Sequence, residues 1–283
     1  MELWYTEKHT PNAQFSIKIN RQLYSAQSPF QRIEILESQE FGKILVLDGF
    51  LMITEKDEFI YHEMITHVPM AVNLCIENIL VIGAGDGGVL SQLTKYPSIK
   101  RIDLVEIDAQ VVEVCKKYFP NIAAGFSDNR VNTHFEDGLK FVRAKQNDYD
   151  LIIVDSTDPF GPGENLFTKE FYGSCFNALT KEGILVNQHE SVYYHSEIDQ
   201  IKKFNKKLKE TFPICKVYQA HIPTYPSGHW LFGFASKVHD PTQNLNADKW
   251  NALNIKTLYY NTNLHKGCFA LPNYVNEALI HTP

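Results

Sequence analysis

The sequence has few of the features that mark secreted or zinc-binding proteins. Its five cysteines are widely spaced and form no Cys-x-x-Cys pair; they are Cys75, Cys115, Cys175, Cys215 and Cys268. An odd number at such spacing argues against both a disulfide framework and a structural zinc site. We therefore expect small buried thiols in a reducing compartment, and no metal site.

Long apolar runs are also missing. No stretch is long enough to span a bilayer, and residues 1–9 lack the apolar core of a signal peptide. Repeats, low-complexity tracts and long charge runs are absent as well. With 44% hydrophobic and 21% charged residues, the composition is typical of a globular protein. We expect a cytoplasmic protein with no membrane partner.

Basic residues are the minority of the charged set. The chain has 27 Lys and Arg against 33 Asp and Glu, a formal net charge of -6. General binding of nucleic acid needs a basic face, so no nucleic-acid partner is expected. A small acidic surplus is compatible with a polycationic small substrate. At 283 residues the chain is long for one domain, which favours one large and one small unit.

The first part of the chain has the pattern of β-strands. Short β-branched segments occur up to about Lys56, and Asp48-Gly49 between two of them is a strong hairpin signal. The expected strands cover residues 15–19, 32–36, 43–47 and 51–54. We predict a small antiparallel β domain over residues 1–56.

The rest of the chain alternates between strands and helices. After a helix from Phe59 to Pro69, five apolar strands are separated by helical segments; these strands cover residues 79–82, 102–105, 131–134, 151–154 and 184–187. Such alternation predicts a parallel, doubly wound sheet. A helix near 198–208 precedes two strands, 215–218 and 230–234, whose short connection makes them antiparallel. We predict a Rossmann-like class I methyltransferase fold, with a mostly parallel seven-stranded sheet and an antiparallel end, over residues 57–283.

Two carboxylates follow the fourth strand of this sheet. Asp155 and Asp158 come directly after the apolar run 149–154. The carboxyl ends of parallel strands are where open α/β sheets bind their ligands. An unpaired buried carboxylate is costly, so two acids here indicate a cationic ligand, or an amine that must lose a proton.

A nucleoside site is indicated at the ends of the neighbouring strands. Gly-Ala-Gly-Asp-Gly-Gly (residues 83–88) opens a helix after the first strand, where Gly83 and Gly85 would allow the backbone to approach a ligand. Glu106 ends the second strand, at the spacing where a carboxylate binds ribose hydroxyls, and Asp137-Gly138 follows the third. Asp86 and Asp137 could instead be helix N-caps.

The charge of Asp86 bears on which nucleoside binds. A negative side chain in this turn would repel a phosphate or the carboxylate of S-adenosylmethionine, and it would attract an aminopropyl ammonium. If Asp86 points inward, the turn favours an adenosyl sulfonium that lacks its carboxylate.

These residues resemble a known family, the polyamine aminopropyltransferases. The similarity extends over nearly the whole chain, with several long motifs in the right order: residues 41–49, 57–64, 83–88, 105–108, 155–163 and 222–225. The resemblance implies a β domain followed by a Rossmann-like methyltransferase domain. It also implies transfer of an aminopropyl group from decarboxylated S-adenosylmethionine to putrescine, giving spermidine and 5′-methylthioadenosine. The donor is a co-substrate, so no separate cofactor is expected.

The resemblance also assigns roles to residues. The implied donor contacts are Gln31, Glu106, Asp137, Gly138 and Pro162. The implied amine and aminopropyl site is Tyr61, His62, Asp86, Asp155, Asp158 and Tyr225. Asp155 matches the family's proton acceptor, and residues 161–164 match its mobile gate. Family members are dimers or tetramers, so we expect a homodimer or homotetramer, with the N-terminal β domain as a plausible contact.

The expected catalytic residues are Asp155, Asp158 and Tyr61. An amine like that of putrescine has a pKa near ~10 and an ordinary Asp near ~4, so Asp155 cannot simply remove the proton. Crowding with Asp86 and Asp158 would raise at least one carboxyl pKa. We expect the site to bind the rare monoprotonated amine, or to pass the proton through water as the nitrogen attacks.

Three alternatives stay open at this point. The acceptor could be cadaverine, agmatine or spermidine, because residues 225–229 depart from some family members in the acceptor pocket. The chain could be an S-adenosylmethionine-dependent methyltransferase of small amines, against which Asp86 argues. It could also be a silent polyamine-binding protein, against which an intact Asp155 and Tyr61 argue.

Overall fold

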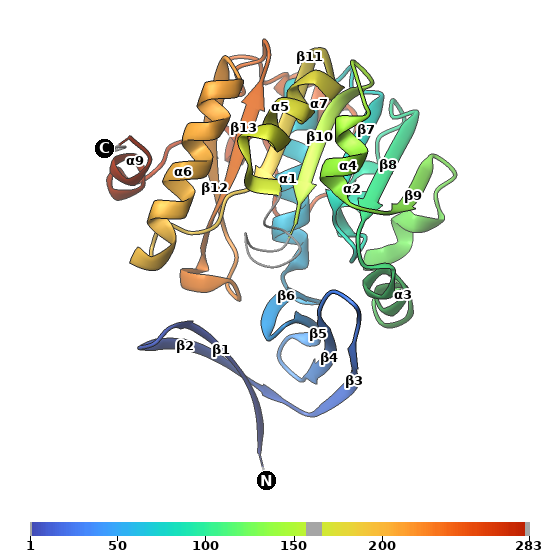
Figure 1. The fold of residues 1–283 in the computed structure, drawn as a ribbon, viewed down its shortest axis with the longest axis vertical. Coiled ribbons are helices and arrows are strands. Elements are labelled where there is room, and N and C mark those ends of the chain that lie inside the picture. Colours follow the sequence, from blue (N-terminus) through green and yellow to red (C-terminus); the bar gives the residue numbers. More distant parts are fainter. Residues whose placement is uncertain (1, 157–165, 281–283) are drawn as a thin grey trace.

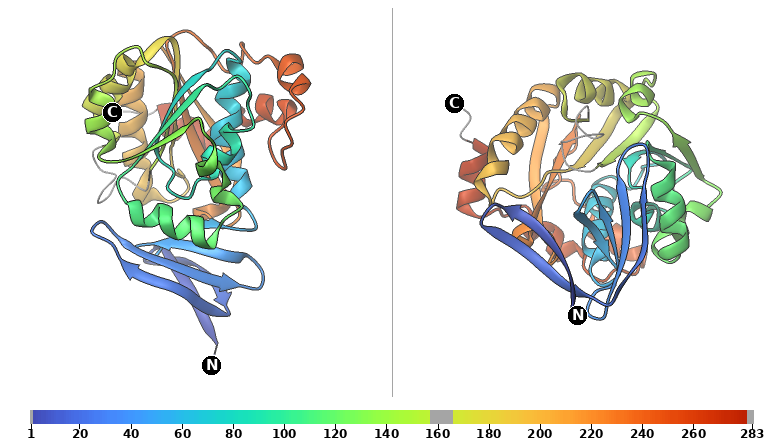
Figure 2. Two further views of the ribbon diagram at one scale, coloured as in Figure 1. Left: turned by 90° about the vertical axis from the view of Figure 1, so that its right-hand side faces the viewer. Right: turned by 60° about the horizontal axis from the view of Figure 1, so that its bottom comes forward.

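Three β-sheets organise the chain, in a computed structural model that describes residues 2–156 and 166–280. Two antiparallel sheets at the N-terminus lie beneath a larger seven-stranded sheet (Figures 1 and 2). The predicted boundary between residues 56 and 57 falls between the last N-terminal strand and the first helix. The division of the chain into two domains at this boundary stays a prediction.

The N-terminal sheets contain six strands. A hairpin of β1 (Leu3–Thr10) and β2 (Ala13–Ile19) precedes a four-stranded meander of β3 (Arg21–Gln27), β4 (Arg32–Ser38), β5 (Gly42–Leu47) and β6 (Phe50–Thr54). The hairpin predicted at Asp48-Gly49 is confirmed, because Leu47 pairs with Phe50 and both turn residues have positive φ. The sequence did not predict β1 and β3, whose largely polar or exposed residues weaken the apolar alternation.

The large sheet has the predicted mixed topology. Its order is β12-β13-β11-β10-β7-β8-β9. The parallel strands are β7 (Asn78–Gly83), β8 (Arg101–Glu106), β9 (Val131–Phe135), β10 (Tyr149–Asp155) and β11 (Leu179–Gln188). β12 (Ile214–His221) and β13 (His229–Ser236) form the antiparallel end. The predicted fold class is therefore confirmed.

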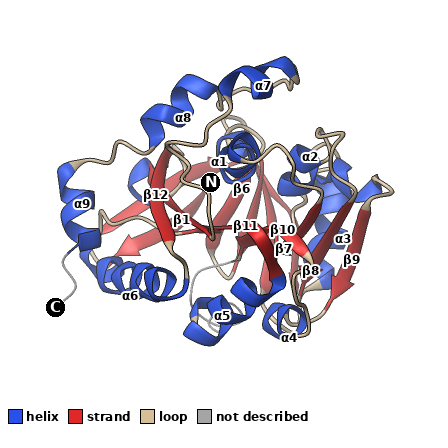
Figure 3. Cartoon of the chain, turned by 90° about the horizontal axis from the view of Figure 1, so that it is seen from above, coloured by secondary structure: helices blue, strands red, loops and turns tan. Residues whose placement is uncertain are grey.

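Helices cover both faces of this sheet (Figure 3). Apolar side chains alternate along the parallel strands, so Ile79 and Val81 face one core while Leu80 and Ile82 face the other. The first core packs against α1 (Glu58–Val72) and α2 (Gly88–Leu93), and the second against α4 (Gly138–Arg143) and α5 (Lys169–Ala178). α6 (His195–Thr211) lies beside α5. α3 (Ala109–Tyr118) packs on the N-terminal sheet, which joins the two parts of the molecule.

Three details of the prediction were wrong. The helix expected to end at Pro69 continues to Val72, with Pro69 inside it. Leu179, expected in a helix, begins β11. Not all cysteines are buried either: Cys75 is exposed and Cys215 is half-buried, while the other three are buried and all five thiols are free. Among the residues described, no helix combines the length and apolarity that a bilayer crossing requires.

The C-terminal segment is anchored to the back of α1. Its short helices α7 (Ala247–Ala252), α8 (Thr262–Cys268) and α9 (Asn273–Ile280) were not predicted. The buried Glu63 carboxylate of α1 accepts backbone N–H groups of Leu258, Tyr259 and Tyr260, each at 2.8 Å. Tyr61 and His62 on the same helix line the site cavity described below. The tail therefore supports the helix that carries these two residues.

We predict that Glu63→Gln destabilises the protein, because the amide keeps only one acceptor oxygen and its NH2 group would face at least one of these backbone N–H groups. The expected loss is about 2 kcal/mol, seen as a fall in Tm of about 5 °C by calorimetry. Glu77→Gln, which removes only an exposed ion pair with Lys100, is the control and should leave Tm within about 1 °C. Equal Tm values for the two variants would contradict this anchoring role.

Candidate active site

One cavity lies at the carboxyl edge of the large sheet, where it meets the N-terminal sheet. Eleven of the predicted site residues line it: Gln31, Tyr61, His62, Gly83, Gly85, Asp86, Glu106, Asp137, Gly138, Asp155 and Tyr225. Asp158 and Pro162, with the predicted gate 161–164, lie outside the described residues. The four strands that precede the acidic residues are neighbours in the sheet, which is why residues far apart in sequence meet here.

Asp155 ends β10 and is held by a tyrosine. The Tyr61 hydroxyl donates a hydrogen bond of 2.5 Å to Asp155 Oδ1. Burial in the cavity and the nearby Asp86 raise the pKa of Asp155 to about 7, although His62 and the Tyr61 bond oppose the shift. Burial and the Asp155 charge raise the pKa of Tyr61 well above its ordinary value, so its hydroxyl stays a donor. Asp155 can therefore exchange a proton near neutral pH.

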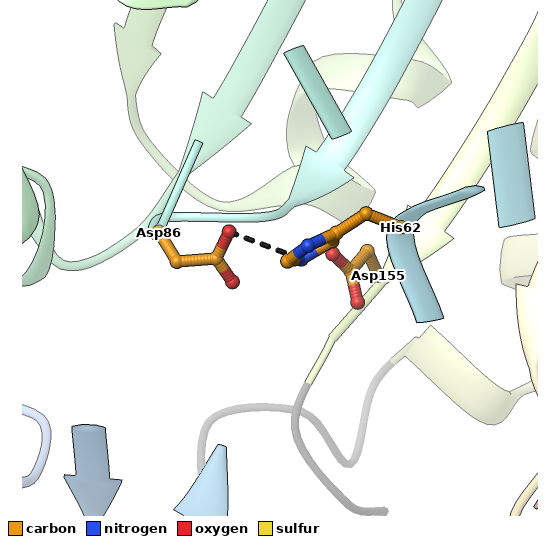
Figure 4. A group of neighbouring side chains, drawn as sticks. All are labelled: His62, Asp86 and Asp155. Carbon is orange, nitrogen blue, oxygen red and sulfur yellow. Dashed lines mark ion pairs between the residues drawn. The ribbon is translucent and has the colours of Figure 1, made fainter. Parts of the chain in front are cut away.

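Asp86 faces Asp155 and is paired with a buried histidine (Figure 4). His62 Nε2 lies 3.3 Å from Asp86 Oδ1, and His62 Nδ1 lies 2.5 Å from Glu58 Oε2. Burial alone would lower the pKa of His62, but Asp86 and Glu58 raise it well above the ordinary value. Burial alone would raise the pKa of Asp86, but His62 and the Gly88 N–H outweigh it and lower that pKa. Both pKa shifts favour the charged forms of this pair, an imidazolium and a carboxylate.

These three side chains could share a cation. One ligand atom each of His62, Asp86 and Asp155 lies within 4.8 Å of the others. A protonated imidazole has no lone pair to give a metal ion, whereas carboxylates accept hydrogen bonds from an ammonium group. The charges of this cluster therefore favour an amine.

The half of the cavity predicted to bind a nucleoside is built around Glu106. Burial raises the pKa of this carboxyl to about 7. Its Oε1 accepts the backbone N–H of Asp108, and Asp108 in turn accepts hydrogen bonds from Gln31 at 3.1 Å and Ser28 at 2.6 Å. No role for Ser28 or Asp108 was predicted. The available signal was a second acid two residues after Glu106, at the N-cap of α3.

The glycine-rich turn brings the two halves together. Gly83 has φ +85°, and a Cβ there would lie 2.0 Å from the Asp155 carbonyl oxygen, which accepts the Ala84 N–H. A Cβ at Gly85 would lie 3.0 Å from Glu106 Oε2. A Cβ at Gly88 would lie 2.1 Å from the His62 ring. The glycines thus leave room for the Asp155 backbone and for the side chains of Glu106 and His62.

Asp137 has a structural role in addition to its place on the cavity wall. It is the N-cap of α4, and its Oδ1 accepts the Lys140 N–H at 2.9 Å. For Asp86 the N-cap alternative was wrong: Gly87 is the N-cap of α2, and Asp86 Oδ1 instead accepts the Gly88 N–H at 2.6 Å.

The other end of the cavity contains polar residues that sequence reasoning missed. They come from β1, the end of β11 and β13, and they are Glu7, His9, Gln188, Glu190 and Trp230. His9 Nε2 lies 3.3 Å from Glu7 Oε1, and burial lowers the pKa of His9. The Trp230 indole N–H is buried without a hydrogen-bond partner among the described residues. No local motif connects these residues, and β1 itself was not predicted.

Hydrogen bonds fix the loop that carries Tyr225 to the elements on both sides of it. The Tyr225 hydroxyl donates to the Met52 carbonyl of β6 at 2.6 Å. The Thr224 hydroxyl donates to Asp57 Oδ2 at 2.8 Å. The Ser227 hydroxyl lies 2.9 Å from that of Ser191. These bonds close the cavity wall between the N-terminal sheet and the antiparallel end.

The fold and this site define a class: a transferase built on a methyltransferase-type sheet, with an acidic half whose charges suit an amine beside the half predicted to bind a nucleoside. Comparison with known families agrees. The spermine/spermidine synthase domain matches residues 58–246, and the spermidine synthase tetramerisation domain matches residues 3–55.

Whole-chain relatives are similar in sequence and in structure. The polyamine aminopropyltransferase of Alkaliphilus oremlandii is 67% identical over 279 residues, covering 99% of this chain and 98% of the relative. That of Clostridium perfringens strain SM101 is 66% identical with the same coverage. A spermidine synthase in complex with the transition-state analogue AdoDATO superposes with a TM-score of 0.95 at 42% identity, covering 98% of this chain and 94% of that one. The Thermotoga maritima spermidine synthase superposes with a TM-score of 0.94 at 41% sequence identity, with the same coverage of both chains. The chain belongs to the polyamine aminopropyltransferase family, and its predicted enzyme class is confirmed.

We predict that Gly88→Ala impairs turnover, because the new methyl group would displace the His62 ring from Asp86. Steady-state kinetics should show a kcat reduced at least ~10-fold. Gly173→Ala in α5, where a Cβ meets nothing within 4 Å, is the control and should keep full activity with equal or higher stability. Full activity of Gly88→Ala would show that the position of His62 is unimportant.

Proposed function

We propose that the chain transfers the aminopropyl group of decarboxylated S-adenosylmethionine to putrescine, giving spermidine and 5′-methylthioadenosine. The observation that supports it most is the pairing of Asp155 with Tyr61 beside Asp86, in one cavity with Glu106. A dedicated amine site adjoining a nucleoside site is what this reaction requires. The similar spermidine synthase that was crystallised in complex with the transition-state analogue AdoDATO supports this proposal.

The charges of the cavity determine where the donor would bind. Its ribose hydroxyls would bind the Glu106 carboxylate, on the side where Gln31 and Asp137 line the wall. Its aminopropyl ammonium would lie by Asp86, which stays ionised because of His62. Intact S-adenosylmethionine would bring a second carboxylate to Asp86, and that repulsion selects the decarboxylated donor.

The acceptor lies across the cavity. One nitrogen of putrescine would be held by Asp155 and Tyr61, and the other would extend toward the polar end with Glu7, Gln188 and Glu190. A diamine has an amino group at each end, and each of them can carry a positive charge. The acidic and amide groups at the far end therefore favour an acceptor with a second charged nitrogen over a simple monoamine.

The chemical step is a direct displacement. The neutral amine nitrogen uses its lone pair to form a bond to the propyl carbon, the carbon–sulfur bond breaks, and its electron pair neutralises the sulfonium as methylthioadenosine leaves. The nitrogen then carries an extra proton, which Asp155 accepts. A carboxyl with a pKa of about 7 takes this proton far more readily than an ordinary Asp. Holding both reactants in line supplies much of the acceleration.

The direct test is methylthioadenosine release with decarboxylated or intact S-adenosylmethionine across putrescine, cadaverine, agmatine and spermidine. We expect turnover only with the decarboxylated donor, and the highest kcat/KM with putrescine. A higher kcat/KM with another amine would overturn the acceptor assignment and keep the chemistry. Methyl transfer from the intact donor would overturn the proposal.

The matched negative control in this assay is Asp155→Asn, which keeps the size and the Tyr61 contact but cannot accept a proton. We expect kcat to fall at least ~100-fold while donor affinity, measured by calorimetry, changes little. Asp248→Asn on the exposed face of α7 should be indistinguishable from the unaltered chain. Loss of donor binding in Asp155→Asn would place Asp155 in the donor site instead.

We also propose that the chain assembles as a homotetramer through its N-terminal sheets. The tetramerisation domain match covers these strands, and Trp4 on β1 is 55% exposed in the single chain, next to exposed Leu3. Successive side chains of a strand point to opposite faces, so Trp4 presents its ring on the face of the hairpin opposite to the buried Tyr5 and Ile17. Tryptophan is enriched in protein–protein contacts.

Light scattering should give four times the chain mass of 32.5 kDa for the unaltered protein and a smaller species for Trp4→Glu. Leu258→Ser, at a residue 79% exposed near the tail, is the control and should stay tetrameric. A monomeric unaltered protein, or a tetrameric Trp4→Glu, would contradict this assembly.

A further inference from the structure

The imidazolium beside the amine site has a partner that the reaction itself does not use. Glu58 lies in the first turn of α1, four residues before His62, so the two side chains share one face of the helix. Glu58 Oε2 and His62 Nδ1 are 2.5 Å apart. The His62 side chain is 1% exposed and that of Glu58 is 18% exposed, so Glu58 lies between the buried imidazole and the protein surface.

We propose that Glu58 is a positioning residue that holds His62 as an imidazolium against Asp86, and that this cation sets the negative charge which the aminopropyl site presents to its substrates. This inference rests on the proposed aminopropyl transfer. Glu58, His62 and Asp86 form a row in which two negative charges flank one positive charge, leaving one net negative charge.

The net charge matters because the acceptor must react as a neutral amine. A site with two unopposed carboxylates would stabilise the ammonium form of the acceptor, whose nitrogen has no lone pair free to attack the donor. The imidazolium reduces that field while leaving Asp86 ionised for the donor's amino group. It also opposes the rise in the pKa of Asp155, which keeps more of this carboxyl in the ionised form near neutral pH.

The geometry leaves His62 little freedom. The ring is packed against Gly88 at the start of α2, where a side chain would collide with it, and each of its two nitrogens lies within 3.3 Å of a carboxylate oxygen. An alternative role for Glu58 is purely structural, since an acid in the first turn of a helix stabilises it. The two roles differ in what they do to pH dependence.

Several titratable or charged groups face this row from the surrounding elements, and each could affect a pH profile. Among the described residues they are Tyr61 from α1, Lys95 after α2, Glu106 from β8, Cys115 from α3 and Asp155 from β10. None of them replaces Glu58 in contact with His62 Nδ1. A change confined to Glu58 therefore acts on the site through His62.

The test is the pH dependence of kcat for Glu58→Gln, with both substrates saturating. The amide oxygen of the new side chain can still accept the Nδ1 hydrogen but carries no charge, so His62 loses its proton at lower pH. A neutral His62 no longer lowers the pKa of Asp155, so the acid limb of the profile should move to higher pH by about 0.5 to 1 unit. His62→Gln, which removes the cation entirely, should move it in the same direction and at least as far.

The matched control is Glu55→Gln, which removes an acid three residues away that pairs with Lys43. Its acid limb should stay in place. If Glu58→Gln lowers kcat equally at every pH, Glu58 is structural and the inference is wrong. A shift of the limb to lower pH would also overturn it.

A second measurement separates this inference from the proposed function. ¹⁵N-histidine spectra, with His62→Gln used for assignment, report the protonation of His62 without turnover. We expect an imidazolium in the unaltered chain at pH 8 and a neutral ring in Glu58→Gln at the same pH. A neutral His62 in the unaltered chain would overturn the inference even if the enzyme is active. Absence of turnover together with the expected spectra would refute only the function.

Discussion

The structure depends on placing two carboxylates, Asp86 and Asp155, close together inside one cavity. Each loses hydration and repels the other, so the arrangement is unfavourable unless neighbouring groups compensate. The Tyr61 hydroxyl, the His62 imidazolium and the Gly88 N–H provide that compensation. The remaining imbalance raises the pKa of Asp155 to about 7. A bound amine would relieve the repulsion, which is why this cluster suits a cationic substrate.

The helix α1 is the element on which these contacts converge. Tyr61 and His62 reach the cavity, Glu58 lies one turn earlier, and Glu63 holds the C-terminal tail on the opposite side. Asp57, at the N-cap, ties α1 to the loop of Tyr225 through Thr224. Parts of the chain that are distant in sequence, from β6 to the tail, therefore stabilise the position of one helix turn. This arrangement links the rigidity of the fold to the geometry of the amine site.

The fold was largely predictable because its information is local. The alternation of apolar strand and helix patterns predicted a mostly parallel sheet with an antiparallel end, and the carboxyl ends of β7, β8, β9 and β10 bring the predicted acids together. The far end of the cavity could not be predicted in this way. Glu7 lies on a largely polar strand, and Trp230 reaches the cavity from the antiparallel end, so only tertiary packing brings them together. Likewise, a lone histidine in a helix carries no sign that Asp86 will be its partner.

A crystal structure of the chain with 5′-methylthioadenosine and putrescine bound would be the most direct test. We expect ribose hydroxyls on Glu106, one putrescine nitrogen within hydrogen-bond distance of Asp155 and Tyr61, and the other toward Glu7 and Glu190. The sulfur would face the first nitrogen. A diamine bound away from Asp155, or a nucleoside in the acidic half of the cavity, would contradict this expectation.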